Sequence, residues 1–301
     1  RGGVGEAVAP ARVGFAEAGG AASGGIAGRR GVQMETWLSG IAGLCLVVGR
    51  ARRLRRNKDR SDGMEINAQA TVGEMVVERP SRARVFERVG IDYCCGGRLT
   101  LAAACAAKGL QAEAVLEALR ASDAERGPEE ATDWEAKGAG ALADHIERTH
   151  HDYLKRELPR LTALTAKVAA VHGGSNAALV ELRDVYAGFA GEMMEHMMKE
   201  EKVLFPWIRS LAAGQAPPRA GIQNPVRVMM AEHEDSGAAL EKMRGLTHGF
   251  APPREACNTY RAMLQGLAEL EADTHTHVHK ENSILFPMAV KLEEAAVAGT
   301  R

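Results

Sequence analysis

From Met64 onward, apolar residues recur with the three- and four-residue spacing of amphipathic helices. The alternating β-branched and aromatic residues typical of strands are absent. This pattern predicts four short helices, over residues 71–78, 81–89, 100–108 and 111–121, with breaks at Pro80, Gly90 and Gly109. The predicted fold class is therefore all-α.

A turn separates the second of these short helices from the third. It has the sequence Asp92-Tyr93-Cys94-Cys95-Gly96-Gly97, and its two glycines permit backbone angles that other residues avoid. The four helices and this turn together predict a small helical module over residues 64–122. Residues 123–140 are charged and contain glycine and proline, which is the composition of a linker.

Four long helices follow and predict an antiparallel four-helix bundle over residues 141–296. The first spans 141–171 and the second spans 176–211. The third begins at Asn224-Pro225, where Asn can cap the helix and Pro fits the first helical position, and it ends near residue 248. The fourth follows Pro252-Pro253. Short connections between long helices favour antiparallel neighbours.

The second and fourth long helices share a sequence pattern. HMMKEEKVLFP begins at His196 and HVHKENSILFP begins at His277, so the pattern recurs at an offset of 81 residues. The first and third helices echo it at an offset of 82, where His151 matches His233. The bundle is therefore predicted to consist of two similar hairpins, each with one lone histidine and one His-x-x-x-Glu pair. The Leu-Phe-Pro ends of the pattern are expected to plug the core and kink the helix.

This spacing is suited to metal binding. Residues four apart on a helix project from one face, about 40° apart, so a histidine and the glutamate four residues later can bind one centre. Four imidazoles and two carboxylates form a donor set of borderline hardness. Six ligands exceed the four of tetrahedral zinc, but they suit two metals that share both carboxylates and keep open coordination positions. The predicted ligands are His151, His196, Glu200, His233, His277 and Glu281.

Neighbouring residues compete with some of these ligands. The apolar stripe of the first helix does not distinguish His150 from His151, and only the repeat favours His151. The repeat likewise selects His277 from the string His275-Thr276-His277-Val278-His279. Lys199 and Lys280 belong to the repeat but cannot bind metal while protonated, so they are expected to face solvent. Three more histidines are expected beside the ligands or on the surface: His145, His172 and His248.

The chain has five cysteines without paired spacing, which does not describe a secreted disulfide framework and fits a reducing cytoplasm. Cys94 and Cys95 are adjacent. Their Cα atoms are about 3.8 Å apart, below the roughly 4.4–6.8 Å of ordinary disulfides, so a bond between them would be strained and easily reduced. The pair is predicted to serve redox chemistry or iron and sulfur handling. The alternative is two small residues in a tight turn.

Residues 1–63 differ in composition from the rest. The net charge of −1 combines +6 in this segment with −7 in residues 64–301, and the segment holds 14 of the 33 glycines. We expect a disordered extension or a start assigned too early, because such a sequence cannot bury enough side chain to offset its ordering entropy. Its apolar run 37–49 is shorter than the roughly 20 residues of a membrane span. A marginal membrane anchor and a basic nucleic-acid arm are the alternatives. The acidic remainder is not expected to bind nucleic acid or membrane.

The Cys-Cys turn followed by the His-x-x-x-Glu repeat resembles the iron–sulfur cluster repair di-iron proteins, the repair of iron centres family. The resemblance covers residues 64 to about 296. The small module is similar to the family's amino-terminal domain, and the bundle is similar to its hemerythrin-like domain. The resemblance implies that the six predicted ligands hold two non-haem iron ions, with Glu200 and Glu281 as bridges. It also implies a cytoplasmic homodimer, and His172 matches a family histidine near the site. Residues 1–63 have no counterpart in the family.

The resemblance further implies repair of iron–sulfur clusters damaged by nitrosative or oxidative stress, through donation of iron to the damaged proteins. Two alternatives stay open. Two ferrous ions with open positions can reduce nitric oxide to nitrous oxide, or the bundle can bind or sense dioxygen or nitric oxide. Hemerythrin-type sites tend to carry more histidines than this repeat supplies, and the cysteine module has no obvious use in plain oxygen storage.

Overall fold

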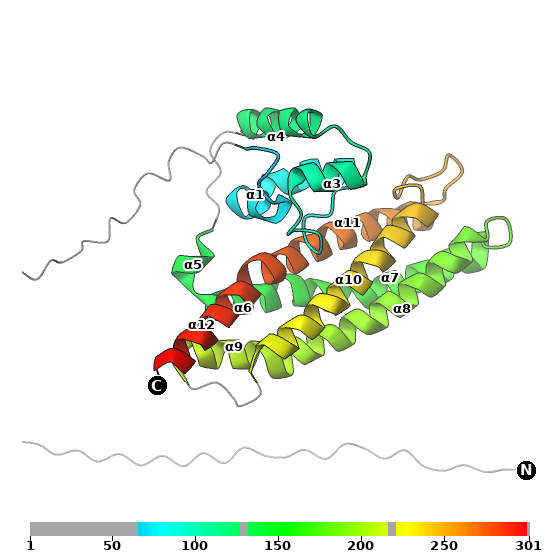
Figure 1. Cartoon of the computed structure of the whole chain (residues 1–301). Helices are drawn as coiled ribbons and strands as arrows, with labels where there is room; N and C mark the ends of the chain where they lie inside the picture. The colour runs from blue at the N-terminus through cyan, green and yellow to red at the C-terminus, as the bar shows by residue number, and fades with distance from the viewer. Residues whose placement is uncertain (1–65, 127–131, 216–220, 300–301) are drawn as a thin grey trace, which may run out of the picture. The chain divides into compact units, whose positions relative to one another are not determined.

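The computed structural model of the chain describes residues 66–126, 132–215 and 221–299, which all lie in the compact unit Asp59–Arg301. The extension predicted over residues 1–63 lies outside the described residues. The described residues contain helices and no strand beyond one isolated bridge between Thr71 and Thr100 (Figure 1). The all-α prediction is therefore confirmed. None of the described helices is long and apolar enough to cross a membrane.

Five short helices form the module that contains the Cys-Cys turn. They are α1 (Val72–Glu78), η1 (Pro80–Arg82), α2 (Ala83–Val89), α3 (Leu101–Ala107) and α4 (Ala112–Arg126). Thr71 begins α1 with a capping box, in which its hydroxyl accepts from the N–H of Glu74 and the Glu74 carboxylate accepts from the N–H of Thr71. Gly90 ends α2 in the left-handed region, at a φ of 69°. The predicted breaks at Pro80 and Gly90 are both found.

This module has a hydrophobic core of its own. Val72, Phe86, Leu101 and Leu119 come from α1, α2, α3 and α4 and are completely buried. Val278, on helix α11 (Asn258–Lys280) of the bundle, belongs to the same hydrophobic cluster. The module therefore packs directly against α11, and this contact fixes where the Cys-Cys turn lies.

Four long helical segments form the bundle, and three of them contain an interruption. The first consists of α6 (Ala139–Ile146), η2 (Glu147–His151) and α7 (Asp152–His172). The second consists of α8 (Ala178–Lys199), η3 (Glu200–Leu204) and α9 (Phe205–Ala212). The third is the uninterrupted α10 (Gln223–Leu246), and the fourth consists of α11, η4 (Glu281–Leu285) and α12 (Phe286–Gly299). The interruptions η2, η3 and η4 are single π-helical turns.

Some boundaries differ from the prediction. Helix α10 begins at Gln223 with Ile222 in the flanking position, so Asn224 and Pro225 lie inside its first turn. Helix α4 continues to Arg126, and the short α5 (Trp134–Lys137) lies within the segment predicted as a linker. The side chain of Asp133 starts α5 by accepting from the N–H of Ala136.

Two hydrophobic clusters fill the bundle on either side of a polar layer. One includes Leu154 of α7 and Tyr186 of α8. The other includes Phe205 of α9 and Phe286 of α12. Along the chain the π turns lie between these clusters, and buried histidines and glutamates occur there. Such groups are costly in an apolar interior unless they have partners, which makes this layer the candidate site.

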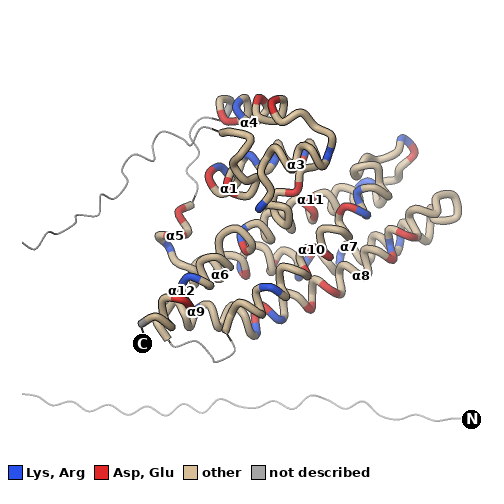
Figure 2. The backbone as a smooth tube through the Cα atoms, in the orientation of Figure 1, with Lys and Arg blue, Asp and Glu red and all other residues tan. Residues whose placement is uncertain are grey.

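The outer helices carry charges of both signs. Lysines, arginines, aspartates and glutamates are interspersed along α8 and α10 (Figure 2). One ion pair, between Lys242 and Glu181, joins the two helices at a distance of 2.9 Å. This mixture is typical of solvated helix faces.

Candidate metal centre

Six buried side chains meet in the polar layer, and they are the six predicted ligands. His151 is the last residue of η2, and Glu200 and Glu281 are the first residues of η3 and η4. The helices α8, α10 and α11 contribute His196, His233 and His277. None of the six is more than 3% exposed.

The four histidines form two facing pairs. The Nε2 atoms of His151 and His277 are 3.3 Å apart, and those of His196 and His233 are 3.1 Å apart. Around each pair, donor atoms of both glutamates also lie within 4.8 Å. The layer thus presents two adjacent groups of four ligands that share both carboxylates.

Glu200 contacts one histidine of each pair. Its Oε2 lies 3.3 Å from Nε2 of His151 and 3.4 Å from Nε2 of His196. Both of its carboxylate oxygens are buried and accept no hydrogen bond from the described residues. A buried carboxylate without donors is costly, and a bound cation would remove that cost.

Glu281 directs one oxygen to each pair. Its Oε1 lies 2.9 Å from Nε2 of His277, and its Oε2 lies 3.1 Å from Nε2 of His233. Within the described part of the chain, Oε2 accepts no hydrogen bond of acceptable geometry. The orientation is that of a carboxylate that bridges two cations.

The hydrogen bond at Nδ1 of each imidazole determines whether its Nε2 atom has a lone pair for a metal. Three histidines donate from Nδ1 to an oxygen 2.9 Å away, in the pairs His151–Glu201, His196–Glu232 and His233–Asn282. A proton held on Nδ1 leaves a lone pair on Nε2, which is the arrangement of a metal-bound histidine. The Nδ1 atom of His277 is buried and has no hydrogen-bond partner among the described residues. The donor set therefore fits two cations, and the hydrogen-bond partners at Nδ1 differ between the two histidine pairs.

The charges of the layer depend on one another. Burial raises the pKa of Glu281, but His277 and His233 outweigh burial and hold that pKa well below its usual value. Burial and the neighbouring Glu281 raise the pKa of Glu200, and the imidazoles around it bring it below its usual value. Burial lowers the pKa of His196, whereas the two carboxylates raise it to about 10. This raised pKa keeps His196 protonated at neutral pH when no metal is bound, so a proton and a cation compete for its Nε2 atom.

The π turns lie at the candidate ligands, and the sequence pattern did not predict these turns. The N–H of Phe205 bonds the carbonyl of Glu200 and the N–H of Phe286 bonds that of Glu281, each five residues earlier. The next residue in each case is a proline, which has no N–H to continue the α-helical ladder. Both phenylalanines are buried, as predicted for the core plugs. Single π turns inside α-helices occur frequently at functional sites.

A second polar cluster surrounds the side chain of Lys280, the last residue of α11. Its Nζ atom donates to Nε2 of His145 and to Nε2 of His150, both at 2.9 Å. His150 in turn donates from Nδ1 to Asp273, also at 2.9 Å. Burial lowers the pKa of Lys280. The prediction that Lys280 faces solvent is wrong, because imidazoles from the adjoining helical segment give the half-buried amine hydrogen-bond acceptors.

His172 lies away from the six ligands. It ends α7, twenty-one residues after His151, which corresponds to about 31 Å of helix. Its Nε2 is 3.5 Å from Sγ of Cys257, and its ring packs on Tyr260. The position near the site that the family resemblance implies for His172 is therefore wrong.

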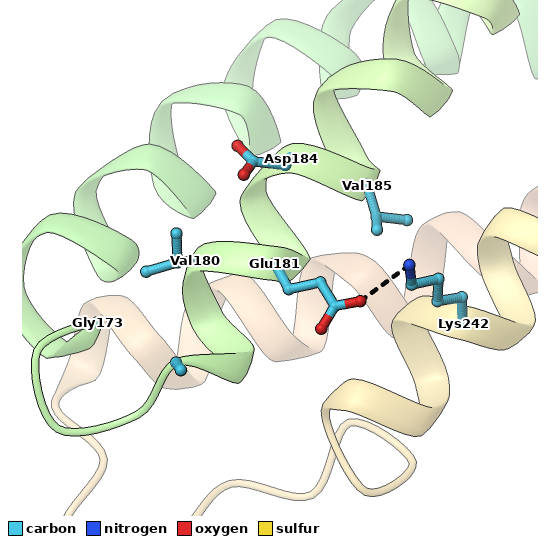
Figure 3. Close-up of a pocket in the computed structure, with 7 residues that line it drawn as sticks. Gly173, Val180, Glu181, Asp184, Val185 and Lys242 are labelled. Atoms are coloured by element: carbon cyan, nitrogen blue, oxygen red, sulfur yellow. Dashed lines mark ion pairs between the residues drawn. The ribbon is translucent and has the colours of Figure 1, made fainter.

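An open pocket lies at this same end of the bundle (Figure 3). Gly173 and Val180 line it, together with Glu181 and Lys242, which form an ion pair across it. These charged side chains are about half exposed, and none of the predicted ligands lines the pocket. The pocket and the polar layer are thus separate features.

The adjacent cysteines lie beside His233. Their Sγ atoms are 3.9 Å apart and form no disulfide. The Cys94 thiol donates to Oδ1 of Asp92 at 3.0 Å, and the Cys95 thiol donates to the carbonyl of His233 at 3.2 Å. The hydrogen bond to Cys95 and burial raise the pKa of Cys94 well above its usual value. Redox chemistry or iron and sulfur handling by this pair stays a prediction, and the sequence carried no signal for its place next to a candidate ligand.

Comparisons with known proteins cover both parts of the described structure. Residues 142–289 match the model of the hemerythrin HHE cation binding domain, and residues 68–123 match that of a domain of unknown function, DUF542. The iron-sulfur cluster repair protein YtfE of Pectobacterium carotovorum is 35% identical over 227 residues, which cover 74% of this chain and 97% of the relative. The proteins of the same name from Citrobacter koseri and Escherichia coli K12 are each 37% identical over 219 residues, which cover 73% of this chain and 96% of the relative.

Proposed function

Because the chain belongs to the family of iron–sulfur cluster repair proteins, we propose that it repairs damaged iron–sulfur clusters with iron held in the polar layer of its bundle. One observation carries the proposal. Four histidines, in two facing pairs, share two fully buried glutamates, and three of the four carboxylate oxygens accept no hydrogen bond from the described residues. Each pair, together with both glutamates, would hold one iron ion.

The donor set favours iron over a single structural zinc. Tetrahedral zinc uses four ligands, whereas the layer offers six in two groups that overlap at the carboxylates. Two histidines and shared carboxylates leave open positions, as in the sites of non-haem iron proteins. Ferrous iron also binds such ligands more weakly than zinc or copper does, which suits a metal that is to be given away.

The cargo of this reaction is iron, and the partners are proteins whose clusters have been damaged by nitrosative or oxidative stress. Cys94 and Cys95 lie on the module that covers the His196–His233 side of the centre, and they would handle iron or sulfur or respond to redox conditions. We further propose a homodimer that acts in the cytoplasm, as the family resemblance of the sequence implies.

The test is repair in a purified system. Iron-loaded protein is mixed without oxygen with a dehydratase whose cluster has been damaged by nitric oxide, and a chelator traps free ferrous iron. We expect the wild-type protein to restore dehydratase activity and Glu200→Ala to fail. Glu195→Ala, at an exposed position five residues earlier on α8, is the control and should repair as the wild type does. Recovery no greater than that from free iron would refute the proposal.

The open positions of both groups also favour a second candidate, the reduction of nitric oxide to nitrous oxide. Two small ligands could bind side by side, because the groups share their carboxylates. Gas analysis above reduced, iron-loaded protein that is given excess nitric oxide would test it. Many equivalents of nitrous oxide per chain would support turnover, and less than one would exclude it.

A further inference from the structure

We infer that Asp92, Cys94 and Cys95 form a third metal site, a transit position for a divalent cation that prefers sulfur ligands, such as ferrous iron. This inference deepens the proposed function and rests on it for the direction of transfer. The existence of the site can be tested separately. One ligand atom from each of the three residues lies within 4.8 Å of the other two.

The spacing of the two sulfur atoms fits one metal. Thiolates bound to a tetrahedral metal at about 2.3 Å have their sulfur atoms about 3.8 Å apart, and the Sγ atoms of Cys94 and Cys95 are 3.9 Å apart. The Cys94 thiol donates its proton to Oδ1 of Asp92 at 3.0 Å. A metal that replaces this proton would lengthen that separation by about half an ångström.

The turn holds the carboxylate in place. Oδ1 of Asp92 accepts from the backbone N–H groups of Cys94 and Cys95, and Oδ2 accepts from that of Gly96, each at 2.9 Å. A Cβ atom on Gly96 would lie 2.8 Å from the carbonyl oxygen of Asp92, and one on Gly97 would lie 2.7 Å from that of Tyr93. The backbone of this turn therefore leaves no room for side chains at Gly96 and Gly97, and it positions the Asp92 carboxylate and the two thiols before a metal arrives.

Two hydrogen-bonded connections link this cluster to the His196–His233 group. The Cys95 thiol donates to the carbonyl oxygen of His233 at 3.2 Å. Asn282 donates from Nδ2 to the carbonyl oxygen of Cys94 at 3.3 Å and accepts from Nδ1 of His233 at 2.9 Å. The cluster therefore lies directly outside one of the two candidate metal positions, as a transit site must.

The cluster is open on one side. Asp92 is exposed, Cys95 is half-buried and Cys94 is buried. Three protein ligands leave a fourth position that a ligand of an acceptor protein can take. Binding is balanced without electron transfer: the cation gives up three bonds to water and forms two metal–sulfur bonds and one bond to the Asp92 carboxylate, while the two thiols release two protons to water.

Cobalt(II) titration of the reduced full-length chain in the absence of oxygen tests the site, because thiolate bound to cobalt has a charge-transfer band in the near ultraviolet. We expect three cobalt ions per wild-type chain, and we expect the band. Cys94→Ser and Cys95→Ser should each lose the band and one cobalt ion while two ions stay bound. Asp92→Asn, which keeps both thiols, should weaken the third ion. The control variants Cys45→Ser, Cys105→Ala and Cys257→Ser should keep the band.

Two results would overturn the inference. One is a folded wild-type protein that binds two cobalt ions without the band, and the other is a band that survives in both Cys94→Ser and Cys95→Ser. Loss of the two histidine-bound ions in Glu200→Ala and Glu281→Ala, with the band retained, separates the two claims. If the band is present but dehydratase repair fails, the proposed function fails and the third metal site stands.

Discussion

Asn282 should decide how tightly the proposed metal at His233 is held. Its Oδ1 accepts the Nδ1 proton of His233 at 2.9 Å. Asn282→Leu has a similar volume and removes this acceptor. His233 is only 1% exposed, so water cannot readily replace the lost partner. The Nδ1 proton can then move to Nε2, where it faces Nε2 of His196 at 3.1 Å and blocks the lone pair that a metal needs.

The expected loss of metal affinity in Asn282→Leu follows from the burial of His233. A buried donor left without an acceptor costs about 1–3 kcal/mol, which corresponds to roughly 5- to 150-fold in a binding constant. Removal of outer partners of metal-bound histidines typically costs about 10- to 100-fold in affinity. Only one of the two metals should weaken, because His151 has a separate partner in Glu201.

Competition against a chelator of known affinity, in the absence of oxygen, measures both ferrous ions. Asn282→Leu should show one ion weakened about 10- to 100-fold and one unchanged. Asn282→Asp is the matched control, because it keeps an oxygen acceptor and should hold both ions within a few-fold of the wild type. The reasoning is refuted if Asn282→Leu, folded by circular dichroism, binds both ions normally or weakens both equally.

Three other predictions concern stability and reactivity. Gly73→Ala should lower the free energy of unfolding, measured by urea titration, by about 1–3 kcal/mol, because its Cβ would lie 2.8 Å from the carbonyl oxygen of Gly97. Gly188 has open space around it, so Gly188→Ala should raise the free energy of unfolding by up to about 1 kcal/mol. Burial lowers the pKa of His279 to about 4, so only the unfolded chain takes up its proton as the pH falls from about 6.5 to about 4. The unfolding free energy should drop by up to about 3 kcal/mol over that range, and an equally steep drop in His279→Asn would contradict this. The hydrogen bond to His172 lowers the pKa of Cys257, so iodoacetamide at neutral pH should modify Cys257 before the buried Cys105, and His172→Phe should slow the reaction.

The cluster of six candidate ligands could be predicted because its arrangement is mostly local. His196 and Glu200 share a helix face whatever surrounds them, and so do His277 and Glu281. The repeat then paired the two halves of the bundle. It also resolved the choice between His150 and His151, which hydrophobic periodicity left open and which burial does not resolve, because both side chains are buried.

The π turns and the outer partners depend on contacts that a single helix does not encode. Glu201 and Asn282 occupy the same position of the repeat, directly after the shared glutamates, and each accepts from the lone histidine of its own hairpin. An alignment of the two halves of the repeat matches Glu201 with Asn282. Only the packed helices show that both side chains point toward a histidine. The place of Lys280 among His145 and His150 likewise depends on which helices are neighbours.

The sequence also did not predict where the small module packs on the bundle. Nothing in the spacing of Cys94 and Cys95 shows that Cys95 would lie against the carbonyl group of His233, 138 residues later. Val278 joins the core of the module, although it lies next to the candidate ligand His277 in the bundle. Such contacts arise from the match of two surfaces, which local patterns do not describe.

The central claim is that four histidines and two shared glutamates hold two iron ions. Diffraction from crystals of the iron-loaded protein at the iron absorption edge tests it most directly. We predict two anomalous peaks inside the bundle, one beside His151 and His277 and one beside His196 and His233, with Glu200 and Glu281 between them. A single peak inside the bundle, or none within reach of the glutamates, would contradict the claim.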